Sequence, residues 1–522
     1  MLGTKEETKK DLLQEVYDAV ISKHRFMYAY GVLYEHVDNI WVEVEDHLVQ
    51  HYLDQTGGQN IDITIRDKSE FIDYLKSHYL VPKEEIQRRN RNNLVAFNNC
   101  YIDTNELRET GEITPHYFIG ELFEGHAVFK TNGEIHTVDD EPIFFSRIPH
   151  NLNLDLLAKL QAELPGCNHP MVILSFLCPT IASFFADLLN PEPPIIQLQK
   201  VAYCFLRANP YKVFFIELGE HDTGKTTYMK LLRKLIGERN ITEKSLQDLA
   251  NYPFSSADLY GKLLNLHDDL TRGAIHNTGL IKQLTGESVI NAHRKFREDL
   301  AFLNYAKLIF TANQLPKVKD LDDDAFFSRV VLTQYKNSFP RSDFAEKLLS
   351  NETELEGLII AALFCLRDLM YRNAFEDNFQ EYSEFWKRHT NSVYDYILTA
   401  IERKELVLDP QLKISKKDLY GLYAAEEKAP VTQNKFTTEL SRLFNVSGDA
   451  QIESEGRRVW AYRGIGIPVL IKDEPSPAPA ELSLEPCSIC SKLKAPAFLH
   501  ILNKKKVCTD CLNGYQSRND EE

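Results

Sequence analysis

The sequence predicts an α/β protein built on a central parallel sheet flanked by helices, with smaller domains on either side. Three apolar runs, at 213–218, 262–269 and 307–313, each lead into polar residues and predict strands of that sheet. The first run continues through a glycine-containing loop into a helical pattern, which is the strand, loop and helix order of α/β folds. With 522 residues, and about 100–200 residues in a typical domain, three or four domains are expected.

The loop after the first strand reads G-E-H-D-T-G-K-T and fits the pattern G-x4-G-K-[ST] at every defined position. In such a loop the backbone amides surround the β- and γ-phosphates, the lysine adds positive charge, and the last hydroxyl can bind Mg²⁺. We therefore expect the chain to bind a nucleoside triphosphate. The candidate cofactor-binding residues are Gly219, Glu220, His221, Asp222, Thr223, Gly224, Lys225, Thr226 and Thr227.

The second strand reads K-L-L-N-L-H-D-D and ends in two carboxylates, Asp268 being 43 positions after Lys225. We expect this strand to lie beside the strand of the phosphate loop. Asp268 would then bind Mg²⁺ and Asp269 would polarise the attacking water. The reverse assignment of the two acids remains open.

The third strand delivers Asn313, whose amide can bond both the γ-phosphate and the attacking water. Sixteen residues further on, Arg329 follows an acidic stretch at 320–324. Its planar guanidinium suits a γ-phosphate presented by a neighbouring subunit. A structural salt bridge to the nearby acids is the alternative interpretation.

Composition limits the remaining function classes. The net charge of −16 confines any nucleic-acid contact to a channel or a small domain. No apolar run reaches the ~18–20 residues that span a bilayer, and the amino terminus lacks an apolar signal core. We expect a cytoplasmic protein without a membrane partner, in the host cytoplasm if it is encoded by a virus or plasmid.

The cysteines fall into two groups. Five are scattered singly through apolar contexts and suit small buried side chains in a reducing compartment. The other four form two C-x2-C pairs separated by 17 residues, which is the spacing of a structural zinc site. The candidate Zn²⁺ ligands are Cys487, Cys490, Cys508 and Cys511.

Together these motifs resemble the superfamily 3 helicases of the AAA+ class, and more narrowly the primase-helicase family of phages, plasmids and poxviruses. Residues 94–103, L-V-A-F-N-N-C-Y-I-D, are similar to the family segment L-x4-N-G-x-L-D, with Cys100 in place of glycine and Ile102 in place of leucine. Residues 280–288 and 292–297 resemble the segment between the second and third motifs, and 414–444 resembles a winged helix. The resemblance covers roughly residues 25–470.

The resemblance implies an AAA+ P-loop core within a ring, usually a hexamer, that hydrolyses ATP between subunits and threads single-stranded DNA through its centre. The implied catalytic residues are Lys225, Asp268, Asp269, Asn313 and Arg329, with Thr226 and Asp268 on Mg²⁺. A hairpin between the second and third motifs would contact DNA through Arg294, Lys295, Phe296 and Arg297. Without the family, that basic run is more often a solvated surface. Ser328 stands where relatives often have a first arginine.

The expected domains follow from this resemblance and from the composition of the chain. They are an N-terminal α+β domain at 1–150, a helical collar for oligomerisation at 151–210, the ATPase core at 211–375, a winged helix at 376–470, a flexible linker at 471–486 and a zinc module at 487–515. Only about 90 residues precede the segment at 94–103, too few for a polymerase-like primase domain. We therefore expect a separate primase or polymerase as a partner.

The favoured function is an ATP-dependent replicative DNA helicase of a virus, plasmid or integrated mobile element, acting on single-stranded and forked DNA. Two alternatives remain. One is a replication initiator or scaffold in which ATP controls assembly on DNA. The other is a packaging motor or an RNA translocase.

Overall fold

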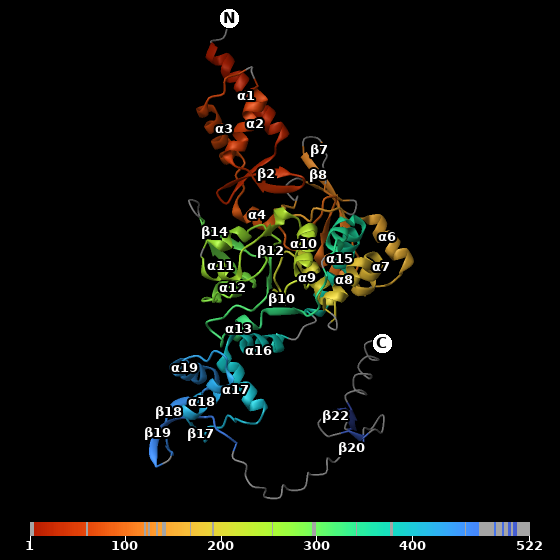
Figure 1. Cartoon of the computed structure of the whole chain (residues 1–522). Coiled ribbons are helices and arrows are strands. Elements are labelled where there is room, and N and C mark those ends of the chain that lie inside the picture. The colour runs from red at the N-terminus through yellow and green to blue at the C-terminus, as the bar shows by residue number, and fades with distance from the viewer. Residues whose placement is uncertain are drawn as a thin grey trace. The chain divides into compact units, whose positions relative to one another are not determined.

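The computed structural model describes most of the chain (Figure 1). For the described residues within 5–8, 122–137, 379–381 and 485–508, the structure describes the backbone only. The described residues are 5–58, 61–118, 122–123, 126–131, 134–137, 142–167, 169–189, 193–252, 254–294, 299–340, 342–375, 379–454, 456–468, 485–486, 493–494, 499–502 and 505–508. By its internal contacts the chain divides into two compact units, Met1–Asp395 and Tyr396–Glu522.

The first unit contains a five-stranded parallel sheet flanked by helices, so the predicted α/β class is confirmed. The strand order is β11-β12-β15-β10-β16. The elements of this part are β10 (Phe214–Gly219), α10 (Lys225–Ile236), a 3-10 turn (Glu238–Asn240), β11 (Ile241–Thr242), α11 (Leu246–Asn251), a second 3-10 turn (Ser255–Leu259), β12 (Leu264–His267), α12 (Gly279–Leu284), β13 (Val289–Ala292), β14 (Leu300–Leu303), β15 (Lys307–Ala312), α13 (Asp324–Phe327), β16 (Val330–Tyr335), α14 (Phe344–Ser350), α15 (Glu352–Arg372) and α16 (Phe379–Thr390).

One expectation about this sheet is wrong. The strand that leads to the two aspartates, β12, does not lie beside β10, because β15 lies between them and pairs with both. All six residues of β15 are buried, as a central strand covered on both faces requires. Since every pairing is parallel, the strands still end at the same edge, and the loops after β10, β12 and β15 meet there.

A block of helices precedes the sheet and shares its hydrophobic core. Figure 1 shows α15 beside α7 and α8, although more than 160 residues separate them in sequence. Leu174, Leu358 and Ile309 are fully buried members of this one core, so the helical block and the sheet fold as one body. The helices of the block are α6 (Leu154–Glu163), α7 (Pro170–Leu177), α8 (Pro179–Leu189) and α9 (Ile195–Phe205).

The N-terminal part of the first unit consists of helices and small antiparallel sheets. Asp38 and Asn39 form a tight turn: both residues have positive φ, and β2 pairs with β3 across them. The elements are α1 (Lys5–Lys23), β1 (Phe26–Ala29), β2 (Val32–Val37), β3 (Ile40–Glu43), α2 (Asp46–Gly57), α3 (Ile65–His78), α4 (Lys83–Arg89), β4 (Leu94–Ala96), β5 (Tyr101–Asp103), α5 (Thr104–Thr110), β6 (Pro115–His116), β7 (Leu122–Phe123), β8 (His126–Thr131) and β9 (Glu134–Thr137).

The second unit contains two helices followed by an antiparallel hairpin. Its three-stranded sheet has the order β17-β19-β18, and Phe436, Leu440, Tyr423 and Tyr462 are buried in this unit. Helix α17 (Ser392–Glu402) crosses the division between the units. The other elements are β17 (Lys413–Ser415), α18 (Lys416–Glu426), α19 (Gln433–Phe444), β18 (Ser447–Ser454), β19 (Arg457–Arg463), β20 (Glu485–Pro486), β21 (Leu493–Lys494), β22 (Leu499–Leu502) and β23 (Lys505–Cys508). Among the helices that the structure describes, none is long and apolar enough to cross a bilayer.

Candidate nucleotide-binding site

The phosphate loop joins β10 to α10, and two of its positions require glycine. Gly224 has φ 86°, and a Cβ there would lie 2.5 Å from Leu188 Cδ2. A Cβ on Gly219 would lie 2.9 Å from both the carbonyl oxygen of Tyr335 and the hydroxyl of Thr223. Helix α10 begins at Lys225 without a side-chain cap, so the amides of its first turn remain open to an anionic ligand.

Lys225 is folded back over this loop and is largely buried. Its ammonium donates hydrogen bonds to the carbonyl oxygens of Gly219 and Glu220, the second at 2.6 Å, and to the hydroxyl of Thr223 at 3.3 Å. Burial lowers the pKa of Lys225 from its usual value, while the charges of Asp268, Asp269 and Glu220 oppose that shift. The ammonium of Lys225 is therefore held among the loop carbonyls, on the side that faces the two aspartates.

Asp268 and Asp269 follow β12, and both form hydrogen bonds with Thr311 of the neighbouring strand, β15. The hydroxyl of Thr311 donates to Asp268 Oδ1 and accepts the backbone N–H of Asp269 at 2.8 Å. Asp269 has φ 56°, a left-handed conformation that turns the chain sharply after the strand. One buried side chain thus fixes both the carboxylate of Asp268 and the backbone of Asp269.

Asn313 lies at the end of β15, two residues after Thr311. Its side-chain amide donates to Asp269 Oδ1 at 3.1 Å. The structure therefore brings together the phosphate loop, Asp268, Asp269 and Asn313, as the sequence predicts. A cavity of about 660 Å³ lies between them, lined by Glu220, His221, Asp222, Thr223, Gly224, Lys225, Thr226, Thr227, Asp268, Asp269, Thr311, Asn313, Phe339, Pro340, Ser342, Phe344 and Ala345.

The groups that line this cavity are suited to binding phosphate and a divalent cation. Uncapped amides and a buried ammonium are groups that bind phosphate oxygens. The exposed hydroxyl of Thr226 and the carboxylate of Asp268 line the same cavity and are oxygen ligands of the kind that Mg²⁺ prefers. The residues present thus fit a magnesium-bound nucleoside triphosphate.

Arg329 is far from this cavity within its own chain. The register pairs Phe214 with Val330 and Gly219 with Tyr335. Arg329 therefore lies at the amino-terminal ends of the strands, whereas the phosphate loop follows their carboxyl-terminal ends. At about 3.3 Å per residue, the five steps along β16 separate the two ends of the strands by roughly 17 Å. Arg329 is absent from the described residues that line the cavity.

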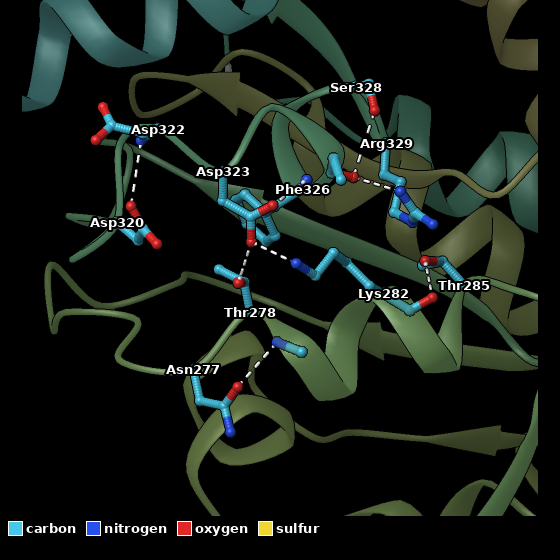
Figure 2. Close-up of polar contacts among 12 residues, drawn as sticks. Asn277, Thr278, Lys282, Thr285, Asp320, Asp322, Asp323, Phe326, Ser328 and Arg329 are labelled. Carbon is cyan, nitrogen blue, oxygen red and sulfur yellow. Dashed lines mark hydrogen bonds and ion pairs between the residues drawn. The ribbon is translucent and has the colours of Figure 1, made fainter. Parts of the chain in front are cut away.

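Figure 2 shows how Arg329 and the nearby acids are engaged. Asp323 accepts hydrogen bonds from Thr278 and Lys282, whereas Arg329 donates to the backbone carbonyl of Ala325. Of the residues that the structure describes, no carboxylate forms an ion pair with Arg329, and its Nε atom is buried without a hydrogen-bond partner. Burial lowers the pKa of Arg329, while the charge of nearby Asp323 opposes that shift, so Asp323 favours the charged guanidinium without pairing with it directly.

The predicted hairpin between the second and third motifs is present as the antiparallel pair β13 and β14. Arg294 follows β13, and its Nη2 donates to the carbonyl oxygen of Tyr30 at 2.8 Å, so it contacts the N-terminal part of the chain. Lys295, Phe296 and Arg297 lie outside the described residues.

The predicted zinc ligands also fall largely outside the described part of the chain. Cys487, Cys490 and Cys511 are not described, and Cys508 is described only as the backbone of the last residue of β23.

Sequence reasoning missed Thr311 and the segment after β16. Thr311 and Asn313 are two residues apart in an extended strand, so they share one face, and that spacing could have identified the threonine. The backbone N–H of Phe339 donates to the carbonyl of Asp222 at 2.7 Å, which holds this segment against the phosphate loop. The segment carries no recognisable motif, so its position could not be inferred from the sequence.

A match to a known protein family covers this site. Residues 218–329 match DUF5906, a family of unknown function, and the match begins at the phosphate loop and ends at Arg329. The chain is also 26% identical over 177 residues to a protein described as putative helicase L207/L206 of Acanthamoeba polyphaga mimivirus. That alignment covers 32% of this chain and only 18% of the viral protein, so the chain is related to a helicase-like viral sequence over a limited segment.

Among solved structures, two of the C-terminal region of NrS-1 resemble the chain. One apo structure has 12% identity and a TM-score of 0.41, covering 88% of this chain and 100% of that one. An A-form apo structure has 11% identity and a TM-score of 0.40, covering 86% and 98%. Because both TM-scores lie below 0.5, we draw no conclusion from these likenesses.

Proposed function

We propose that this chain is the ATP-hydrolysing subunit of a replicative DNA helicase of superfamily 3, an AAA+ enzyme encoded by a virus, plasmid or integrated mobile element. The observation that carries the proposal is the cavity in which Lys225, Asp268, Asp269 and Asn313 converge on the phosphate loop. The limited relation to a putative viral helicase supports the same class.

In this proposal the triphosphate of ATP lies on the phosphate loop, with its γ-phosphate toward Asn313. Lys225 exchanges its loop carbonyls for phosphate oxygens, and Asp269 and Asn313 position the attacking water. Thr226 and Asp268 would hold Mg²⁺, which would supply positive charge to the phosphates. The hydrogen bond from Asn313 to Asp269 supports this assignment, because it places the two water-positioning groups side by side.

We further propose that Arg329 acts on the ATP site of the neighbouring subunit in a ring, with a hexamer as the expected state. Its position at the amino-terminal ends of the strands supports action outside its own site, and so does its buried Nε, which has no hydrogen-bond partner among the described residues. Arginines of this kind contribute about 10³–10⁵ to kcat.

Mixing tests the role of Arg329. Arg329→Ala and Lys225→Ala subunits should each hydrolyse little ATP alone, but a mixture of the two should recover part of the rate, because the intact Lys225 of one subunit can then meet the intact Arg329 of its neighbour. A chain that carries both substitutions provides the control. No recovery in the mixture would exclude action across the interface.

The remaining assignments are proposals for DNA handling and assembly. Arg294, Lys295, Phe296 and Arg297, which follow β13 in the sequence, would contact single-stranded or forked DNA. The helix, helix and hairpin order of the second unit supports a winged helix, and residues 151–210 would form an oligomerisation collar. A primase or polymerase would be supplied by another polypeptide.

The proposed zinc module rests on the spacing of Cys487, Cys490, Cys508 and Cys511. Metal analysis of the purified chain should find about one Zn²⁺ per chain, since four thiolates complete a tetrahedral site. Replacing Cys487 and Cys490 with serine should remove that metal, whereas replacing the isolated Cys167 should not. Full metal retention in the double variant would disprove the assignment.

A strand-displacement assay on forked DNA and on forked RNA tests the function as a whole. We expect ATP-dependent unwinding of the DNA fork, which Lys225→Ala abolishes. DNA binding and assembly that need ATP but produce no unwinding would favour the initiator or scaffold instead. Unwinding of the RNA fork alone would favour an RNA translocase.

A further inference from the structure

A short loop after the catalytic strand presents an arginine that no motif includes. After Asp269 the chain turns, and Leu270 donates its N–H to the carbonyl of Thr311 at 2.8 Å. The side-chain amide of Gln247, on α11, then donates to the carbonyls of Thr271 at 2.9 Å and Gly273 at 3.1 Å. These are the residues on either side of Arg272, so the backbone around Arg272 is fixed from both directions.

Beyond the fixed loop, Ile275 is fully buried and holds the chain against the segment after β15. Its N–H donates to the carbonyl of Lys317 at 2.8 Å, and its carbonyl accepts the N–H of Lys319 at 3.0 Å. The loop is therefore anchored before and after Arg272, while the arginine itself is exposed. An anchored backbone with an exposed cation is an arrangement that presents the side chain to a ligand.

Arg272 lines a second cavity, of about 520 Å³, next to the proposed ATP site. The two cavities share Glu220, His221, Asp269 and Asn313, so they meet at the side where the γ-phosphate would lie. Leu270, Thr271, Arg272 and Gln314 complete the lining of the second cavity.

The charges around the two cavities indicate what Arg272 would bind. Among the described residues that line the first cavity, Lys225 is the only lysine or arginine, whereas four are acidic: Glu220, Asp222, Asp268 and Asp269. Arg272 has no ion pair or hydrogen bond from its side chain within the described part of the chain. A triphosphate brought beside these acids needs further positive charge, and a guanidinium binds phosphate in two-point fashion.

We propose that Arg272 is a phosphate-binding residue of the same subunit's ATP site, contacting the γ-phosphate during hydrolysis and the inorganic phosphate afterwards. In the reaction, a water oxygen bonds to the γ-phosphorus, and the bond to the β,γ-bridging oxygen breaks with its electron pair remaining on ADP. A carboxylate accepts the water proton, and the products are ADP and inorganic phosphate. This inference rests on the proposed ATPase function.

Steady-state hydrolysis by the full chain tests the proposal without DNA present. Arg272→Ala should lower kcat about 100-fold, the usual cost of removing one donor to transition-state charge. Arg272→Lys should recover part of the rate, since it keeps the charge but not the two-point geometry. ADP affinity should change less than about twofold, because ADP lacks the γ-phosphate. Inhibition by inorganic phosphate should require a several-fold higher concentration in Arg272→Ala.

Lys230→Ala is the matched control, because it removes an exposed positive charge on α10 that lines neither cavity and does not anchor the Arg272 loop. Its kcat should equal that of the wild type. If Arg272→Ala also hydrolyses ATP normally but loses affinity for single-stranded DNA, Arg272 is a DNA contact and the proposal is wrong. If the wild type hydrolyses no nucleotide, the ATPase function itself fails, which is a distinguishable result.

Discussion

At the scale of single residues, the site depends on buried groups that hold the reactive ones in place. Thr311 is fully buried and bonds both Asp268 and the backbone of Asp269, while Asn313 bonds the carboxylate of Asp269. A carboxylate that loses such a partner gains rotational freedom and is less well solvated. The position of the acids is thus set from β15 rather than from their own strand.

Replacing Thr311 with valine should impair hydrolysis although the shape of the side chain is conserved. Losing a hydrogen bond to a carboxylate costs roughly 1.5–3 kcal/mol, which corresponds to about a 10- to 100-fold lower kcat. The Mg²⁺ concentration needed for half-maximal activity should also rise. Thr311→Ser keeps the hydroxyl and should restore most of both properties. Equal behaviour of the valine and serine variants would show that the hydroxyl has no positioning role.

Lys307, the first residue of β15, gives the protein a distinct pH dependence. Its ammonium is fully enclosed and donates to the carbonyls of Leu206, Ala208 and Tyr305, and burial lowers the pKa of Lys307 to about 7 from 10.5. Between these values the unfolded chain binds more protons than the folded chain, so this group makes stability rise with pH. The neighbouring Cys204 has its pKa raised to about 12 by burial and stays neutral in this range.

Thermal unfolding at pH 7 and pH 9 measures this effect. The wild type should gain more in Tm across this interval than Lys307→Met, which has no group to titrate there. The difference between the two slopes is the relevant quantity, because the other titrating groups are common to both proteins. Parallel slopes would show that Lys307 remains charged in the folded chain.

At the scale of helices and strands, buried polar pairs join α9 to the sheet. Lys200 and Glu217 are both fully enclosed and form an ion pair at 2.7 Å, and Lys200 also donates to Thr333 of β16. Beside them, Gln197 donates to the hydroxyl of Tyr335 at 2.8 Å, and Tyr335 contacts the phosphate loop at Gly219. The helix thus supports β10 and β16 directly beneath the loop.

Breaking that ion pair on one side should destabilise the fold more than removing it completely. Lys200→Met leaves Glu217 charged and buried without its partner, which costs about 3–5 kcal/mol. The double variant Lys200→Met, Glu217→Gln should recover much of that loss, because no uncompensated charge remains. Urea unfolding of the two variants and the wild type gives the comparison, and additive losses would contradict the explanation.

The same elements show what the sequence could and could not predict. The strands at 213–218 and 307–313 and the helix after the phosphate loop were predictable, because local periodicity determines them. The insertion of β15 between β10 and β12 was not, because strand order depends on pairing between distant segments. A helical lysine such as Lys200 would be expected at the surface, since its buried partner lies on another element.

At the scale of the whole molecule, the first unit contains the complete cavity. Arg329 lies at the other end of the strands of the same sheet. The phosphate loop, the two aspartates and Asn313 were predictable from the sequence, because each follows a buried strand. Arg272 was not, because it lies in a polar loop without periodicity. In the proposed ring, one subunit would supply the phosphate loop, the acids and Asn313, and its neighbour would supply Arg329.

The most direct test of this account is ATP hydrolysis by the purified chain with Mg²⁺ and single-stranded DNA. The wild type should hydrolyse ATP at a rate that DNA increases. Lys225→Ala should lose about 100-fold or more in kcat, since it removes the buried cation of the phosphate loop. Lys319→Ala, which removes an exposed charge outside the cavity, should match the wild type. Wild-type rates in Lys225→Ala would contradict the assignment of this cavity as the site of hydrolysis.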